Sequence, residues 1–260
     1  MSDAATPSVK AVLFDLDDTL FDHLYSTRRG LEAVCAAYPC FQQRPLDELF
    51  LDYTRLLDEV HLLLLQGRLS IDEARRERFR RFFLLHGSTN GDLRNAVEHA
   101  ASLHRETYQA SRQLVAGVLP LLETLHDRVK IAVVTNNLVA EQIDKLRHLK
   151  LEHLVDELVT SEETGSIKPD PEIFRVTLQR LGCEAGETVM VGDSWKSDVL
   201  GARQIGMRAI WLNRTGLPSP DPDLAVEIRA FEPLAEVVAL ILGTADTTRT
   251  LPSSDCTPVP

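Results

Sequence analysis

Two aspartates follow directly on a short apolar segment near the start of the chain. Residues 9–14, VKAVLF, are typical of a strand buried on both faces, and Asp15 and Asp17 come next. On an extended chain, residues two apart face the same side, about 6–7 Å from one another. One carboxylate can attack a phosphorus atom held between them while the other, if protonated, gives its proton to the leaving oxygen. The pair indicates this chemistry, although aspartate is also common in turns after strands.

Other polar residues stand at the ends of later predicted strands or in the loops beside them. Thr135 and Asn136 stand at the end of KIAVVT, Asp193 follows TVMVG, and Lys168 lies in the loop GSIKPDP. In an open α/β sheet the carboxyl ends of the strands meet at one crevice, so these side chains are expected to converge there. A hydroxyl, backbone amides, one cation and several carboxylates together predict a site for phosphate and metal.

The strands that position these residues alternate with helices along the chain. The predicted strands are 9–14, 130–135, 157–160, 188–193 and 208–213, with a short segment at 225–228, and the predicted helices begin at about 120 and then span about 138–149, 171–181, 197–205 and 233–242. Such alternation predicts right-handed βαβ units on a parallel sheet. We therefore expect an α/β fold, with a Rossmann-like parallel sheet core and helices on both faces.

Residues 22–115 replace this alternation with helical periodicity and no convincing strand. Four helices fit the stretch: about 24–37, from Pro45 to about 66, from the capping box of Ser70 and Glu73 to Gly87, and about 91–113. Because ligands bind at this edge of the sheet, we expect 22–115 to form a separate α-helical cap domain. The catalytic core is then 8–21 and 116–243, with flexible termini at 1–7 and 244–260.

Four ordered segments carry a family resemblance: FDLDDTL, VVTNN, SIKPDPEIF and VGDSWKSDVLGA. They resemble the four motifs of the haloacid dehalogenase superfamily of phosphohydrolases, in the family's order and over most of the chain. FDxDxT with a distant GDxxxD is highly specific, whereas VVTNN or a lone KP is weak by itself. The helical insert between the first two motifs is similar to the cap of the first structural subclass.

The resemblance implies a role for each residue that matches a motif. Asp15 is then the nucleophile that forms an aspartyl-phosphate, and Asp17 is the general acid and base. Thr135 and the backbone amide of Asn136 bind the transferring phosphoryl oxygens. Lys168 balances the charge between the nucleophile and the phosphate.

The same resemblance implies a magnesium site. Asp193 ligates Mg²⁺ alongside Asp15 and the backbone carbonyl of Asp17, and Asp198 positions the metal's shell. Clustered carboxylates cannot all stay ionised without cations, and an oxygen-rich site suits Mg²⁺. Asp15 must be unprotonated to attack, which Lys168 and the metal favour. Asp17 must keep a proton, which neighbouring negative charge is expected to favour.

These residues predict a Mg²⁺-dependent phosphatase that acts on a small phosphorylated metabolite. The TNN and SEETGSIKPDPEIF segments resemble nucleotidase and sugar-phosphate phosphatase members, which implies a nucleoside monophosphate or a sugar phosphate as substrate. A phosphomutase uses the same motifs and remains an alternative. A hydrolytic dehalogenase of the superfamily needs no proton donor at Asp17, and in a non-catalytic binding protein the clustered carboxylates would only cost stability.

Composition limits the partners. The chain has 260 residues, and its 39 acidic against 28 basic residues give a net charge of −11, a poor balance for holding nucleic acid. No run of eighteen apolar residues occurs, so we expect no membrane segment. The four cysteines lack metal-ligand spacing and are expected to be free thiols in a cytoplasmic protein. The oligomeric state does not follow from the sequence.

Some residues near the motifs receive no assigned role. His23, just beyond the first motif, and Trp195 and Lys196, inside the last, are left open. The other histidines fall on predicted helices or at their ends and are expected to be solvated or to pack. The charged run at 73–81, EARRERFRR, is interpreted as a solvated face of the cap because its glutamates offset part of its charge.

Overall fold

The computed structural model describes residues 8–87 and 92–244. Its centre is a six-stranded sheet in the order β3-β2-β1-β4-β5-β6, in which every neighbouring pair is parallel. The strands are β1 (Ala11–Phe14), β2 (Lys130–Thr135), β3 (Glu157–Thr160), β4 (Thr188–Gly192), β5 (Arg208–Leu212) and β6 (Val226–Ile228). The predicted α/β fold is confirmed. The termini expected to be flexible, 1–7 and 244–260, lie outside the described residues except for Thr244.

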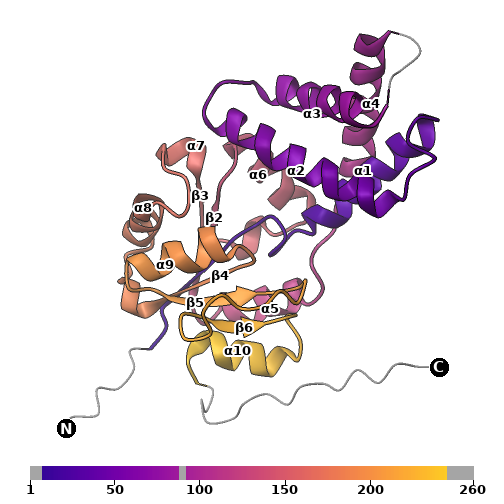
Figure 1. The fold of residues 1–260 in the computed structure, drawn as a ribbon. Coiled ribbons are helices and arrows are strands. Elements are labelled where there is room, and N and C mark those ends of the chain that lie inside the picture. Colours follow the sequence, from indigo (N-terminus) through magenta and orange to yellow (C-terminus); the bar gives the residue numbers. More distant parts are fainter. Residues whose placement is uncertain (1–7, 88–91, 245–260) are drawn as a thin grey trace, which may run out of the picture.

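Helices cover both faces of this sheet (Figure 1). They are α5 (Val118–His126), α6 (Val139–His148), α8 (Pro171–Leu181), α9 (Leu200–Gln204) and α10 (Leu234–Leu242). The β1 side chains alternate between the faces, so Val12 and Phe14 pack in one cluster with α5, α6 and α10, while Ala11 and Leu13 pack in the other with α8 and α9. All four of these side chains are fully buried, which explains the apolar run in the sequence.

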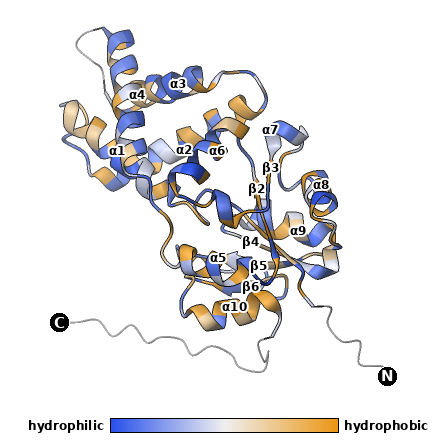
Figure 2. Cartoon of the chain, turned by 180° about the vertical axis from the view of Figure 1, so that it is seen from behind, coloured by the Kyte–Doolittle hydropathy of each residue, from blue (hydrophilic) through white to orange (hydrophobic). Residues whose placement is uncertain are grey.

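A second group of helices stands over the carboxyl end of the sheet (Figure 1). It consists of α1 (His23–Ala37), α2 (Leu46–Leu65), α3 (Ile71–His86) and α4 (Leu93–Ala110). These helices pack around an apolar cluster of their own, whose largest members are Phe41, Tyr53, Phe79, Phe82 and Phe83. The predicted capping box at Ser70 and Glu73 is present. Figure 2 shows that α3 carries mostly hydrophilic residues, whereas α5 and α10 are largely hydrophobic.

The two connections between the helical group and the sheet run side by side. The N–H of Asp22 donates to the Gln113 carbonyl, and the N–H of Val115 donates to the Leu20 carbonyl, both at 3.0 Å. The Ser26 hydroxyl also donates to the Ser111 carbonyl at 3.2 Å. The chain therefore enters and leaves the helical group at one place, a few residues beyond β1.

The helix predicted at 197–205 begins differently from the expectation. A π-helical turn, η3 (Trp195–Val199), precedes α9, and the N–H of Val199 reaches the carbonyl of Ser194, five residues back, at 3.4 Å. The N–H of Ser194 donates in turn to Oδ2 of Asp198 at 3.0 Å. Such wide turns recur at functional sites. Here the turn folds Asp198 back against the end of β4.

Smaller features complete the fold. Short helices that were not predicted are η1 (Glu152–Leu154), α7 (Ser161–Thr164) and η2 (Ala185–Glu187). The cysteines at 35, 40 and 183 are free thiols, as expected, and the fourth lies outside the described residues. Every helix in the described ranges is too short or too polar to cross a membrane.

Candidate active site

Asp15 lies at the carboxyl end of β1, where Lys168 holds its side chain. The Lys168 ammonium donates to Oδ1 of Asp15 at 2.6 Å, to Oδ1 of Asp198 at 2.7 Å and to the Val134 carbonyl at 2.7 Å. These three acceptors match its three donors, and the lysine is only 3% exposed. The sequence places Asp15 and Lys168 at one crevice, and the family resemblance adds Asp198; in the structure Lys168 contacts both aspartates.

Burial dominates the electrostatics of this cluster. It raises the pKa of Asp15 to about 7, because the nearby Lys168 offsets only part of the cost of burying the carboxylate. Burial, together with the charges of Asp15 and Asp198, also raises the pKa of Asp193 well above its usual value. Burial works against the charge of Lys168, but the two adjacent carboxylates raise its pKa above its usual value. Lys168 is therefore charged, but its single positive charge does not balance the negative charges of the carboxylates around it.

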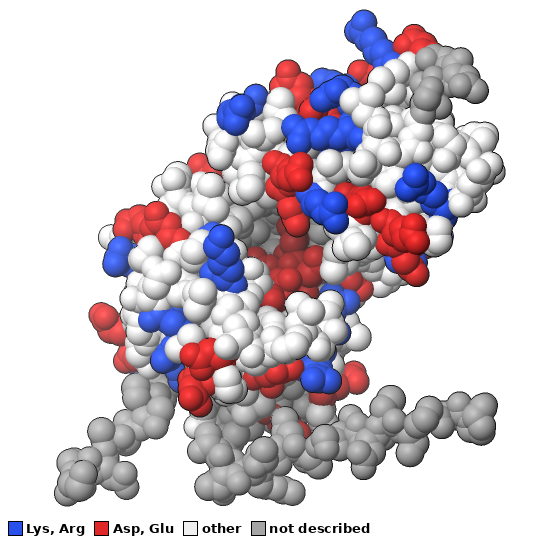
Figure 3. Space-filling view, viewed as in Figure 1, with Lys and Arg blue, Asp and Glu red and all other residues white. Residues whose placement is uncertain are grey.

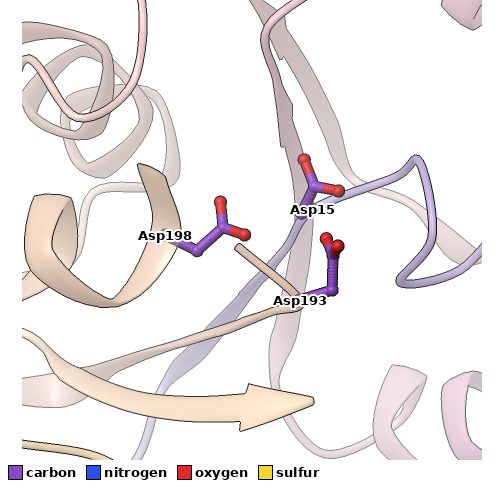
Figure 4. Close-up of side chains that lie close together, drawn as sticks. All are labelled: Asp15, Asp193 and Asp198. Carbon is purple, nitrogen blue, oxygen red and sulfur yellow. The ribbon is translucent and has the colours of Figure 1, made fainter. Parts of the chain in front are cut away.

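Asp15, Asp193 and Asp198 form a group that could hold a metal ion (Figure 4). One carboxylate oxygen from each lies within 4.8 Å of the others. Both oxygens of Asp198 already accept hydrogen bonds, one from Lys168 and one from the N–H of Ser194. Among the described residues, no group donates a hydrogen bond to Oδ2 of Asp15 or of Asp193. These two aspartates therefore have the oxygens most available to a cation, and Asp198 orients the lysine.

Asp193 and Asp198 reach this position because of the residues around the end of β4. The N–H of Asp193 donates to the Thr19 hydroxyl at 3.0 Å, and the indole of Trp211 donates to the Asp193 carbonyl at 2.7 Å. A Cβ at Gly192 would overlap the Asp198 carboxylate, so only glycine allows that side chain to fold over the strand end. Thr19 was not identified from the sequence, although it is the threonine of FDLDDTL.

Asp17 occupies a different electrostatic environment from Asp15. The Lys145 ammonium donates to its Oδ1 at 2.5 Å, and the amides of Asn137 and Gln142 donate to its Oδ2 at 3.2 and 3.4 Å. Burial alone would raise the pKa of Asp17, but Lys145 and the other donors bring it below its usual value. The expectation that neighbouring negative charge keeps Asp17 protonated is wrong for the free site, because the side chain faces α6 and not the other carboxylates.

The strand β2 leads to the residues predicted to bind phosphate. Thr135 is buried and lines the cavity described below. The Asn136 side chain clamps the lysine loop: it accepts the N–H of Lys168 at 2.7 Å and donates to the Lys168 carbonyl at 2.9 Å. The Asn136 carbonyl lies 3.0 Å from Nε2 of His61 on α2. The expectation that His61 only packs or faces solvent is wrong, since its ring joins the helical group to the segment after β2.

Three residues received no role from the sequence, and the structure places them in different surroundings. His23 lies 3.9 Å from Asp17 and 2.9 Å from the Tyr108 hydroxyl, and burial lowers its pKa to about 4. Trp195 packs edge-on against Trp211, with ring centroids 5.2 Å apart. Lys196 is exposed. Only His23 of the three lines the cavity.

A cavity of about 380 Å³ joins the site to the helical group. Its floor carries the residues of the aspartate cluster with Thr135, Asn136 and Lys168, and its far wall comes from α1 to α4. Figure 3 shows acidic side chains at the bottom of the hollow between the two parts of the molecule. The volume suits a small molecule.

Residues 9–206 match the sequence model of the haloacid dehalogenase-like hydrolases. The chain belongs to this family. Two curated relatives of this hydrolase resemble it over most of their length. The glyceraldehyde 3-phosphate phosphatase of Methanopyrus kandleri is 31% identical over 86% of this chain and 92% of its own. The ribulose-1,5-bisphosphate 5-phosphatase of Halopiger xanaduensis is 32% identical over 82% of this chain and 87% of its own.

A solved structure shares the fold of this hydrolase. The magnesium-bound HAD-hydrolase YfnB of Bacillus subtilis aligns with a TM-score of 0.68 at 24% identity, covering 88% of this chain and 98% of that one. The predicted family and the predicted hydrolase class are confirmed.

The raised pKa of Asp15 gives an expected effect of pH on stability. Its value is about 7 in the folded protein against an ordinary 3.8. The contribution of Asp15 to stability is therefore fully present below about pH 4 and is lost as the pH rises through about 7. Asparagine does not titrate, so in EDTA the melting temperature of Asp15→Asn minus that of the wild type should increase from about pH 5 to pH 7 and then level off. Calorimetry across this range checks it, and a flat difference would contradict it.

Proposed function

We propose that this hydrolase is a Mg²⁺-dependent phosphatase that hydrolyses small phosphate monoesters through an aspartyl-phosphate on Asp15. The observation that carries the proposal is the placement of Asp15. Lys168 holds one of its oxygens at 2.6 Å, and its other oxygen has no hydrogen-bond donor among the described residues. The names of the two relatives, both phosphatases, support the same reaction class.

In the first step an oxygen of Asp15 attacks phosphorus, and the bond from phosphorus to the ester oxygen breaks. The leaving oxygen takes a proton from Asp17, and Thr135 with the amide of Asn136 holds the phosphoryl oxygens. The dianionic ester adds negative charge beside Asp17, which raises the pKa of this carboxyl from its low value in the free site. In the second step Asp17, again a carboxylate held by Lys145, takes a proton from the water that attacks the aspartyl-phosphate. The bond from phosphorus to the Asp15 oxygen breaks, which releases inorganic phosphate and restores the Asp15 carboxylate.

The donor set fits Mg²⁺. Asp15 and Asp193, with the backbone carbonyl of Asp17, would hold the ion, and their clustered carboxylates offer the hard oxygen ligands that it prefers. The raised pKa values of Asp15 and Asp193 reflect burial of like charges, which a cation would offset. When bound, the ion supplies positive charge that stabilises the charge of the phosphoryl group during transfer.

The cap and core division is part of the proposal. We assign 22–115 to a cap that closes over a core formed by 8–21 and 116–243. Arg75 pairs with Glu141 at 3.2 Å and Arg112 with Asp144 at 2.5 Å, so salt bridges connect the helical group to α6. Such a cover limits the access of water to the site while the leaving group departs.

The substrate we propose is a sugar phosphate or a nucleoside monophosphate. The relatives named for glyceraldehyde 3-phosphate and ribulose 1,5-bisphosphate favour the first, and a cavity of about 380 Å³ favours a small ester. We place the activity in the cytoplasm without a nucleic-acid partner, in keeping with the net charge of −11.

A panel of phosphorylated metabolites, assayed for inorganic phosphate with Mg²⁺ present, tests the proposal. We expect at least one ester to reach a kcat/KM of about 10⁴ M⁻¹ s⁻¹ or more, within the usual range for enzymes. Isomerisation of a sugar phosphate without phosphate release would indicate a phosphomutase. Halide release from a haloacid, with no ester hydrolysed, would indicate a dehalogenase.

A further inference from the structure

The far wall of the cavity carries arginines from α3, α4 and the segment after α4. They are Arg75, Arg78, Arg105 and Arg112. The interpretation of the run 73–81 as a solvated face holds for Arg80, which is exposed and bonds to Glu77 on the same helix. It is wrong for Arg75 and Arg78, because one side of α3 faces the cavity.

Three of these arginines are neutralised by carboxylates. Arg75 pairs with Asp72 and Glu141, Arg105 with Asp72, and Arg112 with Asp144. Arg78 forms no ion pair or hydrogen bond with any residue in the described ranges, and its Nε is buried without an acceptor. Its guanidinium lies over the face of Tyr53, with Cζ 5.9 Å from the ring centroid.

The three histidines that line the cavity with Arg78 are held in their neutral form. The side chains of His23, His61 and His104 line the same cavity, and burial lowers the pKa of each, to about 4 for His23 and about 3 for His104. The positive charge of Arg78 lowers all three further. Asp58, the carboxylate that α2 contributes to the cavity wall, is exposed and forms no ion pair with a described residue.

Arg78 is partly buried, and leaving its buried Nε without an acceptor costs stability; an anion bound there would offset this cost. Arg78 also lines the cavity that contains Asp15 and Asp17. His61 contacts the carbonyl of Asn136 at 3.0 Å, and His23 lies 3.9 Å from Asp17, so the histidines near Arg78 border the phosphate site. A substrate whose scissile phosphate lies at Asp15 therefore has the wall that carries Arg78 within the same cavity.

We propose that Arg78 binds a second anionic group, a carboxylate or a phosphate, on the leaving-group side of the substrate. This inference rests on the proposed phosphatase function and narrows its substrates to esters with two anionic groups. A guanidinium suits the role because its planar donors pair with either anion through two hydrogen bonds.

The test compares matched esters that differ in the second anion. One pair is 3-phosphoglycerate and glycerol 3-phosphate, and the other is ribulose 1,5-bisphosphate and ribulose 5-phosphate. For each pair, the measured quantity is kcat/KM for the ester with the second anionic group divided by kcat/KM for its partner. In Arg78→Met this ratio should be at least tenfold lower than in the wild type for one pair, mainly because KM for the ester with the second group rises. The first pair tests a carboxylate and the second a phosphate, so the pair whose ratio falls identifies the second anionic group. Arg80→Met, on the outer side of the same helix, should leave both ratios within about twofold of the wild type.

Stability gives a second readout. Without substrate, Arg78→Met should melt at the wild-type temperature or above it, because an unpaired charge is removed; a large decrease would indicate a structural role and overturn the proposal. If Arg78→Met does not fold, Arg78→Gln is measured for the same ratios. Ratios within about threefold of the wild type in both pairs would also overturn it. If the wild type releases no phosphate from any of these esters or from p-nitrophenyl phosphate, the proposed function fails, and this inference with it.

Discussion

Replacing Asp15 by asparagine is expected to lower kcat for phosphate release by at least about a thousandfold, since loss of a covalent nucleophile commonly costs several orders of magnitude. The amide is nearly the same size as the carboxylate and its oxygen can still accept a hydrogen bond from Lys168, which donates to Oδ1 at 2.6 Å. It cannot attack phosphorus. Steady-state kinetics on the best ester of the panel measures the loss, and a melting curve shows whether the fold is kept.

Asp18→Asn is the matched control for this substitution. Asp18 lies three residues from the nucleophile, but its carboxylate accepts the N–H of Leu24 at 2.7 Å and does not contact Lys168. Its backbone is left-handed, with φ of 64°, a conformation that asparagine also tolerates. We expect this variant to keep kcat within about tenfold of the wild type, a difference of about 1.4 kcal/mol in barrier. If Asp15→Asn retained more than about one tenth of wild-type kcat, the aspartyl-phosphate route would be excluded.

The residues that the sequence predicted to be catalytic lie at ends of strands or in loops beside them. Their positions follow from a general property of parallel sheets: strands that run the same way bring their carboxyl ends to one edge. Asp15, Thr135 and Asp193 could therefore be placed together before any contact was known. The boundaries of α3 could also be predicted, since Ser70 marks its beginning and Gly87 its end by local signals.

The environment of Asp17 shows what such reasoning leaves out. Its partner Lys145 lies 128 positions away on α6, and the contact depends on how that helix packs beside β1. Sequence spacing shows which residues of a helix share a face, but not which neighbour that face meets. The predicted direction of the pKa shift of Asp17 is therefore wrong, although Asp17 does line the same cavity as Asp15.

Arg78 was overlooked for a similar reason. The run 73–81 contains five arginines and two glutamates, and composition alone makes such a helix appear solvated. On α3 the glutamate at 77 bonds to Arg80 and Arg81 on one side, while Arg78 turns to the cavity. The side chains of Phe79, Phe82 and Phe83 enter the cluster shared with α1, α2 and α4 and fix the rotation of α3. Only this packing separates the paired arginines from the unpaired one.

Removal of divalent metal is expected to abolish turnover, and Mg²⁺ is expected to restore it. The physical reason is the buried negative charge at the ends of β1 and β4, where Lys168 is the cation that contacts Asp15 and Asp198 and burial raises the pKa of Asp15 to about 7. Without a further cation, an incoming phosphate dianion meets these carboxylates directly. Phosphate release after dialysis against EDTA, and again after Mg²⁺ is added, measures the effect. Full activity in EDTA would exclude the metal site.

Binding can be measured separately from catalysis through stability. A ligand at about 100 times its dissociation constant stabilises the folded protein by about 2.7 kcal/mol, so saturating Mg²⁺ should raise the melting temperature of the metal-free protein by several degrees. Asp193→Asn should reduce this increase because Asp193 offers an oxygen without a donor, whereas Asp47→Asn, at an exposed ion pair with Arg28, should retain it.

Ca²⁺ should also raise the melting temperature but support little turnover, since it takes more oxygens in a looser geometry and can occupy both oxygens of Asp15. Equal turnover with Ca²⁺ and Mg²⁺ would show that the nucleophile keeps a free oxygen whichever ion is bound, and the proposed dependence on a small, strictly octahedral cation would be wrong.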